Sequence, residues 1–340
     1  MFEKECKDPT PGGKREPLAK VLPLKMPYLI QIFPVYACNF KCEYCLHSLE
    51  RSLHGYISDE TVMPWELYTK VIDDIKKTGE HIKMLRFAAI GEPLLHPRIA
   101  EMVAYARQSD IADSIDIVTN GSLLTRELSD QLIDAGLSKL RISLEGLSSE
   151  EYREHTSADV DFQEMVENIR YFYEHCKETD TTVYIKIIDY MVQSEEQQNE
   201  FLRLFSPITH SIAIEHLTPT IEEIDYDKVS HGMKTDKPQN GSVLLESQIC
   251  SQPFYMMQVN PDGNVVPCCS MKYPCVLGNV KEMSLQDIWQ GAKYRSFQRK
   301  MLEGVGEAAK VCGKCTLYRY DMHEEDRLDA DADRLKRCYR

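Results

Sequence analysis

The sequence predicts an α/β protein: a partial (β/α)6, TIM-like barrel followed by a small C-terminal module built from a β-hairpin and a helix. Two observations predict it. Six short apolar runs alternate with amphipathic stretches between residues 28 and 217, and the pattern changes after residue 248. Serial βα units require parallel strands joined by right-handed crossovers. A flat, doubly wound sheet is the competing architecture, and the placement of polar motifs decides between the two.

The apolar runs are expected to form the parallel strands, and the stretches between them the helices. The expected strands are 28–35, 84–90, 114–119, 139–144, 182–191 and 210–217. The expected helices are 64–78 with Pro64 in the first turn, 98–108, 126–135 ended by Gly136, 162–177, and a weaker one at 195–205.

Composition divides the chain into five parts. Residues 1–27 are rich in Pro, Gly, Lys and Glu and predict a mobile lead-in that could dock as an edge segment. Residues 28–217 form the barrel, and the polar stretch 218–248 forms a linker. Residues 249–320 form the second module, and residues 321–340 form a charged tail.

Charge and hydropathy exclude several classes of protein. The 340 residues carry a net charge of −14, which argues against nucleic acid or an anionic membrane as the main partner. No apolar run is long enough to span a bilayer, and the first residues lack the apolar core of a signal peptide, so we expect a cytoplasmic location. Without export, the 12 cysteines indicate metal binding more than disulfides.

Three cysteines follow the first strand within eight residues: Cys38, Cys42 and Cys45. A loop leaving a strand end can turn three thiolates toward one metal centre. Iron–sulfur clusters normally take four cysteine ligands, so three would leave one iron open for chemistry. A structural zinc site completed by His47 remains the alternative.

Polar motifs end the next three strands. They are Gly91-Glu92-Pro93, Thr119-Asn120-Gly121 and the segment from Ser143 to Gly146. Each motif alone is a common turn sequence. In a parallel barrel, however, the carboxyl ends of the strands meet at one rim and build the active site. Their joint placement with the cysteines therefore favours the barrel over the flat sheet.

The second module combines a hairpin, a helix and four cysteines. Asp262-Gly263 is a strong turn signal between apolar runs at 254–259 and 264–267. An amphipathic helix is expected at 284–302, with Ser284 as N-cap and Trp289 on its apolar side. Cys250, Cys268, Cys312 and Cys315 form a complete four-thiolate set. A structural zinc ribbon is the alternative to an iron–sulfur cluster.

The first cysteine motif, with Tyr44 in its aromatic position, resembles the Cys-x-x-x-Cys-x-aromatic-Cys signature of the radical S-adenosylmethionine (SAM) superfamily. The resemblance covers residues 28–217. It implies that the three cysteines hold a [4Fe–4S] cluster whose open iron is chelated by SAM. It also implies reductive cleavage of SAM to a 5′-deoxyadenosyl radical that abstracts hydrogen from a substrate.

The same resemblance assigns further cofactor contacts. Gly91 and Glu92 match the end of a Gly-Gly-Glu motif that binds the SAM amino group, although Ile90 replaces its first glycine. Ser143 and Glu145 match a pair that contacts the SAM ribose and carboxylate, and Asn120 matches an element near SAM. Lys186 is a candidate partner of the SAM carboxylate, with a solvated lysine as the alternative.

The second module resembles the SPASM/twitch extension, which binds auxiliary clusters. No cysteines follow Cys315 at the intervals of the full pattern, so the resemblance implies the shorter version with one auxiliary cluster. The expected cofactors are therefore two [4Fe–4S] clusters and SAM. Four protein ligands imply a closed cluster that passes electrons, with a flavodoxin- or ferredoxin-type protein as electron donor. Because oxygen damages an open cluster, we expect an anaerobic or microaerobic setting.

The short auxiliary module resembles that of radical SAM alcohol dehydrogenases. The leading hypothesis is dehydrogenation or epimerisation of a small hydroxylated substrate such as a sugar, aminocyclitol or nucleotide sugar. Cys269 and Cys275 are candidate hydrogen donors for epimerisation, and buried thiols without a role are the alternative. Two further hypotheses are a maturase that crosslinks or epimerises a ribosomally made peptide, and a non-catalytic metal-binding scaffold.

Overall fold

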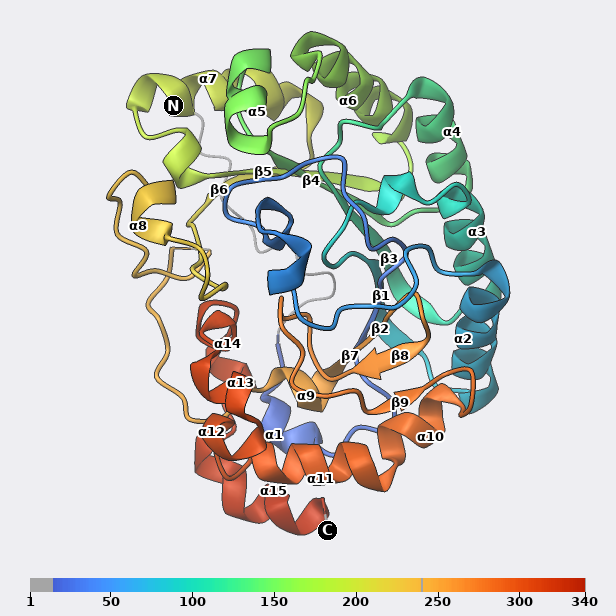
Figure 1. Cartoon of the computed structure of the whole chain (residues 1–340). Helices are drawn as coiled ribbons and strands as arrows, with labels where there is room; N and C mark the ends of the chain where they lie inside the picture. The colour runs from blue at the N-terminus through green and yellow to red at the C-terminus, as the bar shows by residue number, and fades with distance from the viewer. Residues whose placement is uncertain (1–14, 240, 340) are drawn as a thin grey trace.

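One continuous nine-stranded sheet organises the protein, in the order β6-β5-β4-β3-β2-β1-β7-β8-β9 (Figure 1). The computed structural model describes residues 15–239 and 241–339. Strands β1 to β6 pair in parallel with their neighbours along the chain, and the helices between them lie on the outside of the curved sheet. The expected α/β barrel architecture is confirmed.

The elements have the following bounds. The strands are β1 Leu29–Ile32, β2 Ile82–Phe87, β3 Ala112–Thr119, β4 Lys139–Leu144, β5 Thr182–Ile188, β6 Ser211–Glu215, β7 Met256–Val259, β8 Asn264–Val266 and β9 Gly278–Asn279. The longer helices are α2 Trp65–Thr78, α3 Ile99–Ser109, α4 Arg126–Asp134, α5 Ser149–Thr156, α6 Phe162–Cys176, α7 Glu195–Phe205 and α11 Ala292–Met301. The shorter helices are α1 Leu18–Val21, α8 Tyr226–Val229, α9 Gln252–Tyr255, α10 Leu285–Gln290, α12 Val305–Ala308, α13 Lys310–Lys314, α14 Leu317–Tyr320 and α15 Ala332–Cys338.

The two faces of the barrel sheet differ in polarity because successive side chains of a strand point to opposite faces. The outer face is apolar and packs against the helices: Phe87 of β2, for example, has its ring centroid 5.9 Å from that of Tyr68 in α2, and both are fully buried. The opposite face, which we call the inner face, carries polar and charged side chains. Arg86 of β2, Asp116 of β3 and Arg141 of β4 meet there.

The C-terminal module continues the barrel sheet. Strand β7 pairs in parallel with β1, and Gln31 of β1 donates a hydrogen bond of 2.6 Å to Gln258 of β7. The expected hairpin is present as β7 and β8, which are antiparallel. It begins at Met256, two residues later than expected, because Pro253 stands in the first turn of α9 and favours a helical start.

Two expectations about the C-terminal half are wrong. The helix expected at 284–302 is two helices, α10 and α11, because Gly291 between them adopts an extended backbone (φ −70°, ψ 156°). Residues 321–339 are more than a charged tail, since Leu328, Leu335 and Tyr339 are buried in the core.

The described part of the lead-in docks through the short helix α1 and the chain on either side of it. Residues 15–27 pack against the C-terminal module: Trp289 Nε1 donates to the Leu24 carbonyl at 3.0 Å, and Arg334 donates to the Ala19 carbonyl at 2.6 Å. Arg15 forms an ion pair of 3.0 Å with Asp326. The expectation of a mobile lead-in for residues 1–14 lies outside the described residues.

Candidate functional site

Residues 38–45, the cysteine loop, leave the carboxyl end of β1 and are anchored to neighbouring elements. Two backbone amides of the loop, at Lys41 and Glu43, donate to carbonyl groups at the end of α5 at 2.8 and 3.1 Å. The buried Phe40 ring packs edge-on against Tyr152 of α5, with centroids 5.8 Å apart. The path of the loop is therefore fixed by main-chain bonds and by an apolar anchor.

The thiols of Cys38, Cys42 and Cys45 lie within electrostatic reach of one another. Burial raises the pKa of Cys42 well above its usual range, and negative charge on Glu145, Cys45 and Cys38 raises it further. Burial also raises the pKa of Cys38 to about 12, opposed by the amide of Phe40, which donates to its sulfur at 3.4 Å. A bound metal cation is what stabilises thiolates in such a place.

The three thiols offer an all-sulfur donor set just after the carboxyl end of β1. Across residues 15–239 and 241–339, no three His, Cys, Asp or Glu side chains are grouped so that they could hold one metal ion. The ligands of a four-iron cluster each bind a different iron, so their sulfurs need not converge on one point. The donor set, all sulfur, also matches iron–sulfur chemistry.

Glu92, in the loop after β2, is hydrogen-bonded to the carboxyl end of β3. Its buried carboxylate accepts hydrogen bonds from the Leu94 amide at 2.8 Å, the Thr119 hydroxyl at 2.7 Å and the Asn120 amide at 2.8 Å. Burial raises the pKa of Glu92 to about 7, and these donors oppose the shift. Both carboxylate oxygens already have protein partners, so Glu92 holds the ends of β2 and β3 together beside the cysteine loop.

Gly91 lies where the loop after β2 crosses the chain leading into the cysteine loop. A Cβ atom at this position would stand 2.0 Å from the Val35 carbonyl oxygen and 2.9 Å from that of Ala37. Only glycine permits such a close backbone approach.

Replacing Gly91 with alanine is expected to lower the free energy of unfolding by about 2 kcal/mol or more, because the backbone would have to separate to admit a methyl group. Thermal denaturation of the variant measures the loss. Gly306→Ala is the matched control, since a Cβ atom there would meet nothing within 4 Å. Equal stability of the two variants would contradict the close contact.

Glu145 and Tyr44 are brought together from β4 and the cysteine loop. The Tyr44 hydroxyl donates to Glu145 Oε1 at 2.7 Å. The second oxygen, Oε2, is buried without a partner among the described residues, and so is the hydroxyl of Tyr190, whose ring lies 6.4 Å from that of Tyr44. Burial raises the pKa of Glu145 to about 7, and the Tyr44 hydroxyl, the Lys186 ammonium and the nearby Cys42 thiol oppose the shift. A buried carboxylate oxygen without a donor is costly, which indicates that a ligand supplies one.

The other expected contacts of the cofactor are spread along the same rim. Asn120 donates to Asn39 of the cysteine loop at 2.9 Å and approaches Cys38 Sγ at 4.0 Å. Ser143 is half-buried and pairs in register with Lys186 of the neighbouring strand β5. Lys186 itself forms a 2.5 Å ion pair with Glu215 of β6, so its ammonium group already has an anionic partner.

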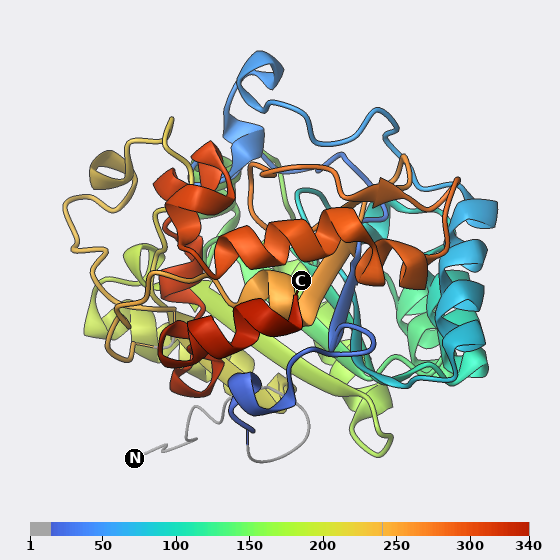
Figure 2. The same ribbon diagram turned by 90° about the horizontal axis from the view of Figure 1, so that it is seen from below.

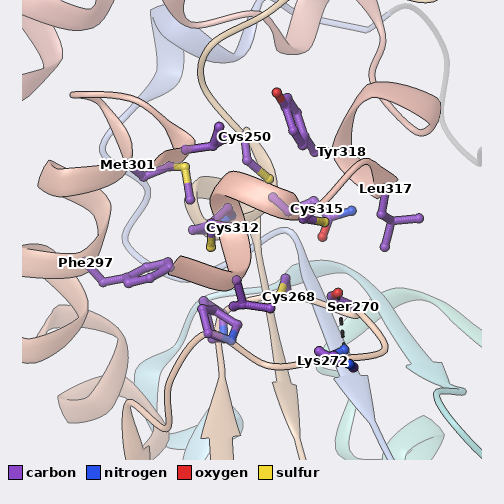
Figure 3. A pocket seen from close by; sticks show the side chains of 16 residues that line it. Cys250, Cys268, Ser270, Lys272, Phe297, Met301, Cys312, Cys315, Leu317 and Tyr318 are labelled. Atoms are coloured by element: carbon purple, nitrogen blue, oxygen red, sulfur yellow. Dashed lines mark hydrogen bonds between the residues drawn. The ribbon is translucent and has the colours of Figure 1, made fainter. Parts of the chain in front are cut away.

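Cys250, Cys268, Cys312 and Cys315 line one cavity in the C-terminal module (Figure 3). The cavity, which we call the four-cysteine cavity, has about 420 Å³ of space, part of it open to solvent. Cys250 and Cys268 are buried, whereas Cys312 and Cys315 are half-exposed near the surface. Four thiols around one space fit a closed cluster with no open iron.

The two remaining cysteines of the module lie in different surroundings. Cys269 donates from Sγ to Gln252 at 3.8 Å. Burial raises its pKa to about 12, with Asp321 adding to the shift and Arg86 of the inner face opposing it. Cys275 instead experiences Lys293 and Lys300, which oppose the effect of burial on its pKa. Only Cys269 therefore lies beside the inner face of the barrel.

Sequence reasoning missed several side chains of the inner face. Asp321 was assigned to the tail, yet burial raises its pKa and Arg86 opposes the shift. Arg86 has a buried Nε atom with no partner among the described residues, and Arg141 donates to Asp116 at 3.0 Å. The only signal for Arg86 and Arg141 was a charged residue at an alternate position of an apolar strand.

Two family models match this chain. The model described as "Radical SAM superfamily" matches residues 32–192, and the model described as "Iron-sulfur cluster-binding domain" (SPASM) matches residues 250–316. The matches contain all seven candidate cluster ligands: Cys38, Cys42 and Cys45 in the first, and Cys250, Cys268, Cys312 and Cys315 in the second.

Two curated relatives align with this chain over most of their own length. The chain is 27% identical over 297 residues to the "Tungsten-containing aldehyde ferredoxin oxidoreductase cofactor-modifying protein" of Pyrococcus furiosus, covering 77% of this chain and 80% of the relative. It is 22% identical over 334 residues to the "AdoMet-dependent heme synthase" of Methanosarcina barkeri, covering 83% and 89%. A GTP 3′,8-cyclase of Chlorobaculum tepidum is 34% identical but matches over only 36% of its length.

Solved structures share the fold. BtrN in complex with AdoMet and 2-DOIA superposes with a TM-score of 0.54 and 18% identity, covering 87% of this chain and 98% of that one. Streptococcus suis SuiB bound to S-adenosylmethionine superposes with a TM-score of 0.60 and 17% identity, covering 89% and 74%. Within the described residues, no helix has the length and apolarity needed to cross a membrane.

Proposed function

This chain is a radical SAM enzyme with a C-terminal SPASM domain, and we propose that it removes hydrogen from a small hydroxylated substrate, such as a sugar, aminocyclitol or nucleotide sugar. The outcome of the reaction is dehydrogenation or epimerisation. In this proposal Cys38, Cys42 and Cys45 hold the cluster that binds SAM, and the four cysteines of the SPASM domain hold one auxiliary cluster.

The unpartnered Oε2 atom of Glu145 carries the proposal. SAM brings amine and ribose hydroxyl donors together with a positive sulfonium, and a buried carboxylate beside three thiols accepts such groups. When bound and reduced, the cluster and SAM together supply a radical that can remove hydrogen from an unactivated C–H bond. The protein contributes the fixed position of the carboxylate, set by the Tyr44 hydroxyl, and the bracing of the rim by Glu92.

Replacing Glu145 with glutamine is expected to weaken SAM binding by roughly 10- to 100-fold, since a hydrogen bond to a charged, buried acceptor is worth about 1.5–3 kcal/mol. Equilibrium dialysis of labelled SAM against the anaerobically reconstituted protein measures the change. Glu150→Gln, at an exposed position of α5, is the matched control. Unchanged SAM affinity in a Glu145 variant with full iron content would refute the assignment.

The polar side chains of the inner face favour a polar substrate over an apolar one. Arg86, Asp116 and Arg141 surround the middle of the barrel, and the Lys186–Glu215 pair lies on the neighbouring strands β5 and β6. A substrate rich in hydroxyl groups can exchange hydrogen bonds with such side chains, whereas an apolar substrate would leave them without partners. The four-cysteine cavity supports dehydrogenation in particular, because loss of a second electron from the substrate requires an acceptor.

The two remaining cysteines of the module differ in their suitability as hydrogen donors, and deuterium labelling distinguishes epimerisation from dehydrogenation. Cys269 is the better placed hydrogen donor, because its thiol lies beside Arg86 and Asp321 and that of Cys275 does not. In deuterated water an epimerase would incorporate one deuterium at the inverted carbon, while a dehydrogenase would give a ketone.

For an epimerase, Cys269→Ala is expected to abolish deuterium incorporation, and the matched variant Cys275→Ala is expected to retain it. Mass spectrometry of a panel of sugars, aminocyclitols and nucleotide sugars provides the measurement. Ketone formation that is unaffected by Cys269→Ala would assign dehydrogenation. Neither ketone nor deuterium with any member of the panel would count against the substrate class.

Modification of a peptide is the second candidate. SuiB has been solved bound to its precursor peptide SuiA, and anSMEcpe with the Cp18Cys peptide, and both share this fold at 18% identity or less. A short peptide rich in hydroxyl side chains would also suit the inner face. SAM cleavage that depends on such a peptide, and on no sugar, would favour this candidate.

A further inference from the structure

The outer surface of helices α11 to α13 is basic, although the protein as a whole is acidic. Residues 292–320 contain seven Lys or Arg residues and only two acidic residues, whereas the full chain has a net charge of −14. The basic residues therefore gather on one part of the surface, and the excess of acidic residues covers the rest of the chain.

The basic residues of this surface are exposed along both flanks of α11: Lys293 and Lys300 lie toward Cys275, and Arg295 lies toward Tyr339. We call Lys293, Arg295, Arg299 and Lys300 of α11, together with Lys310 of α13, the basic face. Among the described residues, no carboxylate oxygen lies within 4.0 Å of a side-chain nitrogen of any of the five. The neighbouring Lys314, in contrast, is paired with Glu222 at 2.9 Å. Helix α11 runs across the middle of the view from below (Figure 2).

The same helices that carry the basic face outside line the four-cysteine cavity inside. The apolar side chains of Phe297 and Met301 on α11, and of Val311 on α13, form part of the cavity wall. An α-helix with its side chains is about 10–12 Å across, so roughly one helix diameter separates the basic face from the cavity. Lys293 and Lys300 lie near Cys275, the residue that follows Pro274 of the cavity wall.

A cluster held by four thiolates has no open iron, so its chemistry is the transfer of single electrons. Such a site needs a partner that comes close to it, and a partner with negative charge would be repelled by the acidic remainder of this protein. A local basic surface attracts and orients an acidic partner.

We propose that the basic face docks a small acidic one-electron carrier protein, which exchanges electrons with the cluster in the four-cysteine cavity. The inference rests on the proposed auxiliary cluster and adds the place and the charge of its redox partner. One electron passes between the carrier and the cluster, and no bond forms or breaks in the docking step.

Charge reversal tests the docking surface. The double variant Lys293→Glu/Lys300→Glu is compared with Lys76→Glu/Lys77→Glu on α2, which changes the net charge equally at exposed positions outside the basic face. The probes are a reduced acidic flavodoxin and a reduced acidic [2Fe–2S] ferredoxin. Calorimetric affinity and the stopped-flow rate of electron transfer to the reconstituted protein are measured at about 0.05 M and 0.3 M salt.

The basic-face variant is expected to bind at least one carrier roughly tenfold more weakly, with a correspondingly slower electron transfer and a weaker salt dependence. The α2 variant is expected to change by less than about twofold. Equal losses in both variants would show that net charge matters and the face does not. The proposal would be overturned if both carriers bound the wild-type protein and neither variant weakened their binding.

The failure of docking can be distinguished from the failure of the proposed function. Iron analysis and electron paramagnetic resonance after chemical reduction report whether the auxiliary cluster is present in each protein. A wild-type chain without this cluster would overturn both the premise and the docking proposal. A normal cluster with unaltered carrier binding in the basic-face variant would overturn the docking proposal alone.

Discussion

Replacing Cys42 with alanine is expected to abolish SAM cleavage, lowering its rate by at least about a thousandfold. Cys42 is buried at the centre of the cysteine loop, with Cys38, Cys45 and Glu145 around it. Loss of one of three ligands leaves a cluster with too few protein ligands to be retained. Formation of 5′-deoxyadenosine in the presence of dithionite measures the rate, and iron analysis is expected to show the loss of one cluster.

Cys176→Ala is the control for this experiment. Cys176 is buried on α6 and is packed among apolar side chains, so its removal costs stability but no metal. Full iron and SAM cleavage in the Cys42 variant would contradict the assignment of the cysteine loop. Zinc in place of iron in the wild-type protein would favour the structural-site alternative and the non-catalytic scaffold.

Replacing Cys312 and Cys315 together with alanine is expected to halve the iron content while preserving SAM cleavage. These two residues supply half of the thiols in the four-cysteine cavity, which is lined by α9, the segment after β8 and helices α11 to α14 and contains no residue of the cysteine loop. The first cluster would still react, but the second electron of a dehydrogenation would have no acceptor. The expected result is formation of 5′-deoxyadenosine with at least about a hundredfold less ketone.

The exposed Cys338 of α15 provides the matched control, since Cys338→Ala removes a thiol from the C-terminal segment without touching the cavity. Normal ketone formation in the double variant would show that the auxiliary site is not the electron acceptor. Loss of SAM cleavage with retention of the first cluster would indicate that the domain is needed for folding or substrate binding instead.

Much of the fold follows from the pattern of apolar residues. Strand β4 lies at the expected residues, and so does helix α7, although its periodicity in the sequence is the weaker of the two. The Ser194 capping box also marks the start of α7. The pairing of β7 with β1 could not be predicted, because both strands are short apolar runs more than 200 residues apart and nothing local specifies their neighbour.

The candidate site was only partly predictable for a similar reason. Closely spaced cysteines and turn motifs at strand ends can be recognised in the sequence. Tyr44 and Glu145, which belong to two of these motifs, are in contact in the structure. Arg86, Asp321 and Tyr190 come from three distant segments and become neighbours of the site only through the fold. Whether each of them faces the site depends on the side of the strand or loop on which its side chain lies. The sequence does not indicate that side for a single residue outside a periodic pattern.

The parallel pairing of β1 with β7 has a mechanical consequence. The cysteine loop leaves β1, and the segment that ends in Cys268 follows the β7–β8 hairpin. The main-chain hydrogen bonds between these strands therefore connect the two regions rigidly. In the proposed two-cluster enzyme, the separation between the clusters would be fixed by the register of these strands and by the adjoining loops rather than by a hinge. Any opening needed to admit a substrate has to come from the loops at the rim.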